Sequence, residues 1–164
     1  MSHIHHIDRL IRHDDKTPLH TLSATASEVS DLAASLDREP KRKVVARVVR
    51  GETCRTTKAL FDEFAAAWQF PSYFGKNWDA LDECLADLEW LPAEAYVLFV
   101  TDATLLLADE KPEVFNLFVE IVEGLAREWN SASFHIVLQA DKADESKLGE
   151  RLKLTGIKFD ALTS

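Results

Sequence analysis

Residues 70–101, FPSYFGKNWDALDECLADLEWLPAEAYVLFVT, decide the fold class of this chain. The middle of this stretch predicts a helix over about 77–88, because apolar residues recur there at helical spacing and Asn77 is a good N-cap. Residues 95–101 are a continuous apolar run, which is typical of a strand buried on both faces of a parallel sheet. A helix followed closely by such a strand indicates a fold in which helices and parallel strands alternate.

The same alternation extends along the chain in both directions. Apolar runs at 43–49 (KVVARVV) and 133–139 (SFHIVLQ) predict two further buried strands, and residues 57–68 and 112–125 carry apolar side chains at helical spacing. We therefore predict an α/β fold, with a small three-stranded parallel β-sheet and right-handed helical crossovers.

This predicted domain spans residues 43–140. Residues 1–42 form an N-terminal extension that could add a βα unit, and its first part, 1–18, is expected to be a loose, partly disordered tail. Residues 141–164 are expected to form a C-terminal tail, for which the sequence predicts no particular structure.

Size and composition indicate an intracellular globular protein. The chain has 164 residues, of which 46% are hydrophobic, enough for one sizeable core. No apolar run approaches the roughly 20 residues of a membrane span, and the N-terminus lacks the apolar stretch of a secretory signal. The two cysteines, Cys54 and Cys84, imply no disulfide framework, so we expect a reducing cytoplasm. Five scattered glycines form no phosphate-binding loop, and we expect no cofactor.

The net charge of −9 is concentrated in one part of the chain. Residues 77–110 hold nine acidic residues and no lysine or arginine, which leaves 28 − 9 = 19 acidic residues against 19 basic ones elsewhere. A negative field of this kind repels nucleic acid and attracts cationic surfaces. The charge distribution therefore predicts a basic protein partner and excludes a nucleic-acid partner.

The predicted helix over 77–88 has one apolar face and one wholly acidic face. The acidic face carries Asp79, Asp82, Glu83 and Asp87, three of which are spaced four residues apart with no base between them. Like charges four residues apart destabilise a helix by about 0.2–0.5 kcal/mol per pair, so local stability does not explain the pattern. A solvated helix face is the ordinary alternative, but a partner that neutralises these charges accounts for the one-signed face better.

The segment YFGKNWDAL (73–81), within residues 48–92, resembles the barstar family, the intracellular inhibitors of barnase-type ribonucleases. The resemblance implies three parallel strands packed with helices, and a mechanism in which the helix and its preceding loop block a ribonuclease active site. It also implies binding residues: Tyr73, Gly75 and Asn77 match the contacting loop, and Asp79 and Glu83 match the two key helix acids.

The chain departs from the founding member of that family in three places. Glu83 is one methylene longer than the aspartate found there, and Asp82 replaces an aromatic contact residue. A further acid on the last helix of the family has two candidates here, Glu123 and Glu128. Trp78, just after the N-cap, could border the interface.

We therefore expect a non-enzymatic inhibitor or immunity protein that is monomeric when free. The alternative is a barstar-like module that docks to or regulates another basic protein without nuclease activity. An acid–base pair made of Asp79 and Glu83 is disfavoured, because such a pair needs one carboxyl in an apolar pocket. His3, His5 and His6 suggest at most adventitious metal binding, and His135 is expected to be a strand histidine with its hydrogen bonds satisfied.

Overall fold

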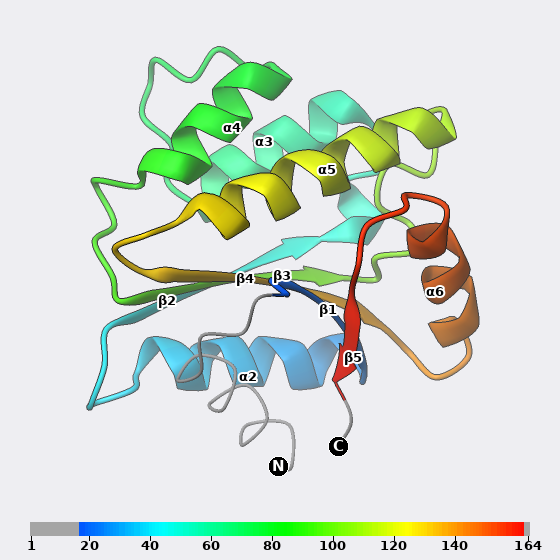
Figure 1. Cartoon of the computed structure of the whole chain (residues 1–164), viewed down its shortest axis with the longest axis horizontal. Helices are drawn as coiled ribbons and strands as arrows, with labels where there is room; N and C mark the ends of the chain where they lie inside the picture. The colour runs from blue at the N-terminus through cyan, green and yellow to red at the C-terminus, as the bar shows by residue number, and fades with distance from the viewer. Residues whose placement is uncertain (1–16, 163–164) are drawn as a thin grey trace.

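The computed structural model describes residues 17–162, which form strands and helices in alternation (Figure 1). The strands are β1 (Leu19–Ser23), β2 (Val44–Arg50), β3 (Ala95–Thr101), β4 (Ser133–Ala140) and β5 (Asp160–Leu162). The helices are α2 (Ala26–Asp37), the short 3-10 helix η1 (Gly51–Thr53), α3 (Thr57–Ala67), α4 (Trp78–Asp87), α5 (Pro112–Glu128) and α6 (Glu145–Lys153).

The five strands form one parallel sheet in the order β2-β3-β4-β1-β5. The α/β class and the parallel sheet are confirmed, but the predicted number of three strands is wrong. The three strands expected from the apolar runs are the neighbours β2, β3 and β4, and β1 and β5 extend the sheet beyond β4. Strand β1 and helix α2 form the βα unit that the N-terminal extension was expected to allow.

The two additional strands lack the apolar runs that mark the others. Strand β1 pairs with β4 in the register Leu19 to Ile136, and the three residues of β5 pair only with β1. Thr17 and Pro18, expected to belong to a loose tail, are buried, and the Pro18 carbonyl accepts a 2.8 Å hydrogen bond from the N–H of Ile136. This hydrogen bond from a distant strand thus holds Pro18 against β4.

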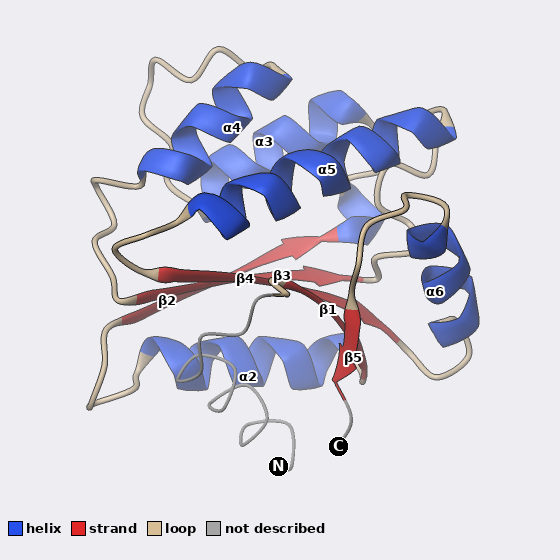
Figure 2. Ribbon diagram, in the orientation of Figure 1, coloured by secondary structure: helices blue, strands red, loops and turns tan. Residues whose placement is uncertain are grey.

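Helices cover both faces of the sheet (Figure 2). Helices α3, α4 and α5 lie on one face, over a core that includes the fully buried Trp68, Phe64 and Phe118. Helix α2 lies on the opposite face and packs through the apolar side chains Val29, Leu32, Ala33 and Leu36. Because α4 and α2 are separated by the sheet, the acidic helix and the N-terminal helix present different surfaces of the molecule.

Helix α6 packs on the core through the buried Leu148 and Leu152 and is also joined to it by one arginine. Nη1 of Arg151 donates to the carbonyls of Ala103 and Thr104 at 3.1 and 3.3 Å, and the guanidinium lies 3.6 Å from the ring centroid of Phe115. Burial lowers the pKa of Arg151 to about 10. This side chain therefore links α6 to the segment after β3 and to α5.

Replacing Arg151 by methionine is expected to lower the free energy of unfolding by about 2 kcal/mol, because two carbonyls lose a charged donor while the apolar stem is kept. Chemical denaturation measures this loss. The matched control is Arg55→Met, which removes an exposed pair with Asp109 and is expected to cost less than about 1 kcal/mol. Equal losses in the two variants would show that Arg151 is no more than a surface residue.

Candidate functional site

Helix α4 is capped at both ends by its own sequence. The Asn77 side-chain oxygen accepts a 2.8 Å hydrogen bond from the N–H of Ala80, which confirms the predicted N-cap. At the other end Leu88 adopts a left-handed conformation, with φ at 47°, and its N–H donates to the Cys84 carbonyl. The indole N–H of Trp129 donates to the Leu85 carbonyl at 3.2 Å and ties the last turn to the segment after α5. Hydrogen bonds at both ends thus hold the helix on the core.

The outer face of α4 carries four exposed carboxylates: Asp79, Asp82, Glu83 and Asp87. The inner face is apolar, with Leu81, Cys84 and Leu85 buried. The ion pairs formed between residues 17–162 leave out all four of these carboxylates. The acidic face of α4 is therefore charged, exposed and held in place by the buried side of the same helix.

A further acid from α5 lies close to this face. Partial burial raises the pKa of Asp82, and the negative charges of Glu128, Asp79 and Glu83 raise it further. Helices α4 and α5 pack against each other (Figure 1), and Glu128 is the last residue of α5. Glu123, the other candidate on α5, is buried and accepts a hydrogen bond from Arg127 at 2.9 Å. Of the two candidates, Glu128 is the one that joins the acidic face.

The raised pKa of Asp82 has a consequence for stability. A carboxyl whose pKa is higher in the folded chain than its ordinary 3.8 destabilises the fold when it ionises. Replacing Asp82 by asparagine is therefore expected to raise the melting temperature at neutral pH. The gain should vanish below pH 3.8, where the aspartate is protonated in both the folded and the unfolded states.

Thermal melts at the two pH values, with Asp31→Asn on α2 as a charge-matched control, measure this effect. No gain for the Asp82 variant over the control at neutral pH would mean that neither burial nor the neighbouring acids disfavour the charged form of Asp82.

The loop before α4 is anchored by aromatic contacts and an ion pair. The Phe74 ring packs edge-on against Phe70 and Phe61, with centroids 4.9 and 6.1 Å apart. Nζ of Lys76 lies 3.3 Å from Oδ1 of Asp62, and this lysine lowers the pKa of the Asp62 carboxyl. With its neighbour Phe74 held inward, the loop projects Tyr73 outward.

Tyr73 is the most exposed aromatic residue of the site, with 71% of its surface accessible. Partial desolvation raises the pKa of its phenol, and the nearby Cys84, Asp87 and Glu89 contribute to the rise. The phenol therefore lies near the C-terminal end of the acidic face of α4. Tyrosine at such a position offers both a ring and a hydroxyl to a partner.

Gly75 and Trp78 lie differently in this segment, because Gly75 is exposed and Trp78 is partly buried. A Cβ added to Gly75 would lie 3.2 Å from Nδ2 of Asn77, so the missing side chain leaves room for the N-cap residue. The Trp78 ring packs against Phe61 and Phe118, with centroids 5.0 and 6.5 Å apart. Trp78, expected at the rim of the interface, is partly buried and contacts the core.

The groups that acid–base, metal or thiol chemistry would use are placed as follows in the described part of the chain. Asp79 and Glu83 are both exposed, and residues 17–162 contain no group of three or more side chains arranged to hold a metal ion. His3, His5 and His6 lie outside the described residues, and His135 is buried in β4 with its ring centroid 5.7 Å from that of His20. Burial raises the pKa of the Cys54 thiol to about 11. Across the described part of the chain, no helix is long and apolar enough to span a membrane.

The periodicity of the sequence predicted the acidic face of α4. It did not predict the contacts with distant segments that hold this helix and its surroundings in place. The choice of Glu128 over Glu123 depends on how α5 packs against α4. The hydrogen bonds from Trp129 to Leu85 and from Trp90 to the Trp68 carbonyl join segments that are distant in sequence. The tryptophans near the ends of the predicted helices were the available signal, because a buried indole N–H usually finds an acceptor.

Several solved structures share this fold. Aeropyrum pernix ORC2 in its ADP form has a TM-score of 0.64 and 12% identity, and the match covers 98% of this chain and 46% of that one. Cdc6p from Pyrobaculum aerophilum has a TM-score of 0.58, 16% identity and coverages of 98% and 44%. Drosophila ORC bound to GC-rich DNA and Cdc6 has a TM-score of 0.56, 14% identity and coverages of 98% and 28%. The chain thus spans less than half the length of these structures, and the identity is low enough that the likeness shows the fold alone.

A family model matches the chain across the site. None of the curated proteins compared with the chain matched it. The model of the family described as Barstar (barnase inhibitor) matches residues 44–141, which run from β2 to just past β4 and include α4, its preceding loop and α5. This confirms the resemblance carried by the YFGKNWDAL segment. The chain belongs to the barstar family.

Proposed function

We propose that this chain inhibits a barnase-type ribonuclease by placing α4 and the preceding loop over the cationic active site of that enzyme. One observation carries the proposal: the outer face of α4 presents four exposed carboxylates that form no ion pair with another described residue. An interaction with a basic partner would offset the repulsion among these charges, which the free protein leaves uncompensated.

Inhibition of this kind requires no covalent chemistry. The active site of an RNA-cleaving enzyme must be basic to bind phosphates, and carboxylates at suitable spacing can occupy the same positions. Asp79 and Glu83, one turn apart, would take the central positions. Asp82, Glu128 and Asp87 would surround them, and the exposed Tyr73 would contact the partner beyond the C-terminal end of the helix. The proposed protein binds and blocks, and it catalyses no reaction.

The site is built to bind without rearrangement. Its helix is capped at both ends, and its loop is anchored by Phe74 and by the Lys76–Asp62 pair. A preorganised surface loses little conformational entropy on binding, so more of the interaction energy contributes to affinity. The acidic field would also speed association with a basic partner, as the barnase–barstar pair itself exemplifies.

The alternative is a basic partner that is not a nuclease. The observation in its favour is Asp82, a partly desolvated acid where the founding family member offers an aromatic ring. An added carboxylate beside Glu128 calls for an additional cation on the partner, so the partner surface must differ from that of the founding complex. Capture of a basic protein without nuclease activity, together with no inhibition of ribonucleases, would favour this alternative.

Association kinetics at two ionic strengths test the proposal. The purified protein is passed over immobilised ribonucleases of the barnase type, and we expect fast association that slows as salt rises, with a much smaller change in dissociation. Association that is independent of salt would contradict a binding site made of the α4 acids. The proposed setting is the cytoplasm, where the two free thiols would remain reduced.

A further inference from the structure

The outer edge of β2 is closed by side chains in a specific pattern. The Lys43 carbonyl accepts hydrogen bonds from the N–H groups of Glu94 and Ala95, so odd-numbered residues of β2 turn their backbone groups toward β3. The even-numbered residues turn theirs toward the free edge of the sheet. Two of these, Ala46 and Arg50, have both outward groups engaged by side chains.

The first of these caps comes from the end of α2. The N–H of Ala46 donates to Oδ1 of Asp37 at 2.9 Å, and Nη1 of Arg47 donates to the Ala46 carbonyl at 3.3 Å. The same arginine nitrogen lies 3.1 Å from Oδ2 of Asp37, so one ion pair satisfies both outward groups of Ala46.

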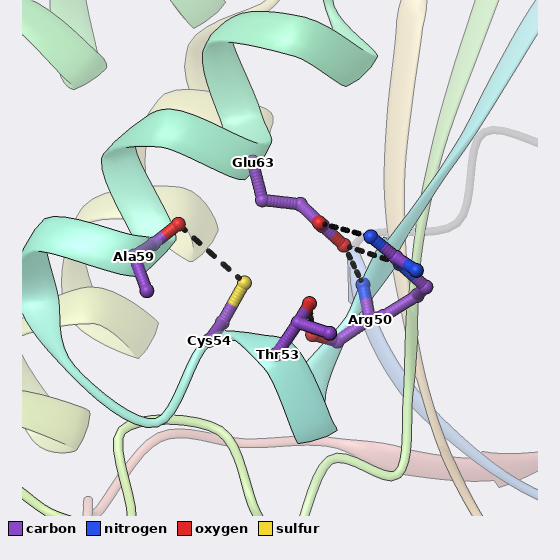
Figure 3. Close-up of polar contacts among 5 residues, drawn as sticks. All are labelled: Arg50, Thr53, Cys54, Ala59 and Glu63. Carbon is purple, nitrogen blue, oxygen red and sulfur yellow. Dashed lines mark hydrogen bonds and ion pairs between the residues drawn. The ribbon is translucent and has the colours of Figure 1, made fainter.

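The second cap comes from α3 and the turn after β2 (Figure 3). The N–H of Arg50 donates to Oε2 of Glu63 at 2.7 Å, and the Thr53 hydroxyl donates to the Arg50 carbonyl at 3.0 Å. The Arg50 guanidinium also binds both oxygens of Glu63, at 3.0 and 2.8 Å. The Glu63 side chain is only 15% exposed, so this carboxylate is held against the strand.

The two edge strands of the sheet differ in length, and this difference indicates what the caps on β2 do. Strand β5 at one edge has three residues, and a short edge strand offers little to pair with. Strand β2 at the other edge has seven residues, VVARVVR, four of them valine. A long β-branched edge strand is a template for addition of another strand.

We propose that the Asp37 and Glu63 caps keep the β2 edge closed, and that its occupant when open is β2 of a second copy of this chain. Antiparallel pairing of two identical strands about a two-fold axis at Val48 places Ala46 of one copy opposite Arg50 of the other. The two capped positions are therefore the two that flank the axis. Each cap occupies backbone groups that this pairing would need.

The test is the mass in solution of the full chain carrying Asp37→Ala and Glu63→Ala. We expect a twofold rise, from the 18.5 kDa of one chain to a dimer, in light scattering coupled to size exclusion. The charge-matched control, Asp31→Ala with Glu52→Ala, removes two exposed acids from α2 and the turn after β2 and should remain monomeric. Adding Val48→Pro to the Asp37/Glu63 double variant should restore the monomer, because it removes the N–H at the centre of the pairing.

Three results would overturn the proposal. The first is a folded Asp37/Glu63 double variant that remains monomeric. The second concerns the variant that combines Asp37→Asn with Glu63→Gln and so retains an oxygen acceptor for each N–H. Dimerisation of this variant to the same extent as the double alanine variant would overturn the proposal.

The third comes from hydrogen exchange in the unmodified protein and does not depend on the variants folding. We expect the Ala46 and Arg50 amides to exchange at least tenfold more slowly than that of Val48. Equal rates at the three amides would mean that the caps do not hold in solution.

Discussion

Replacing Asp79 and Glu83 together by alanine is expected to weaken binding to an inhibited ribonuclease by about 1,000-fold. Truncating a residue at the centre of a tight interface costs about 2 kcal/mol or more, and each 1.4 kcal/mol is tenfold in affinity. The barnase–barstar pair is itself one of the measured examples behind that range. The two residues are neighbours on α4, so the two losses need not add in full.

The fold should survive this change. Both side chains are exposed, and their removal relieves like-charge repulsion of about 0.2–0.5 kcal/mol per pair. Loss of Asp79 from the first turn removes a helix-dipole contribution of similar size, so the net effect on unfolding is small.

Titration calorimetry of the complex, with thermal melts of the free variant, separates these two effects. The control variant, Asp31→Ala with Glu150→Ala, removes two exposed acids from α2 and α6 and should bind as the unmodified chain does. Equal weakening in the two variants would assign the effect to net charge instead of to α4.

Replacing Gly51 by alanine is expected to lower the free energy of unfolding by about 3 kcal/mol or more. A Cβ at this position would lie 2.3 Å from the Asp102 carbonyl oxygen and 2.6 Å from that of Thr101. Both are backbone atoms at the end of β3, so the clash cannot be relieved by turning a side chain. For a domain of this size, the loss corresponds to a fall in melting temperature of roughly 6–12 °C.

The chain offers a matched control for this substitution in α5. A Cβ at Gly124 meets nothing within 4 Å, so Gly124→Ala should raise stability by about 0.5–1 kcal/mol. Denaturant unfolding measures both variants. A Gly51→Ala variant that is as stable as the unmodified chain, or more stable, would show that the close approach of η1 to β3 is absent in solution.

The elements that could be predicted from the sequence are those marked by a local pattern of residues, such as an apolar run or helical periodicity. Strands β2, β3 and β4 are apolar runs because they are buried within a parallel sheet, and α4 shows its two faces in its periodicity. The cap at Asn77 is local and could also be predicted. Each of these features depends on residues close together in the chain.

The rest of the fold depends on partners distant in sequence. Strand β1 is ordered by β4, more than a hundred residues away, and β5 by β1. The residues of β5 are mostly exposed, so no apolar pattern marks it as a strand. Contacts between distant segments also decide that Glu128, and not Glu123, lies near the acidic face of α4. They likewise place Trp78 against Phe61.

The most direct test of the central claim is a titration of RNA cleavage. A barnase-type ribonuclease is held at fixed concentration while the purified chain is added, and cleavage of an RNA substrate is followed. We predict that activity falls linearly to zero at one chain per enzyme, and that the Asp79/Glu83 double alanine variant leaves the enzyme active at the same ratio. Full activity in a several-fold excess of the unmodified chain, for every ribonuclease of a representative panel, would contradict the proposed inhibition.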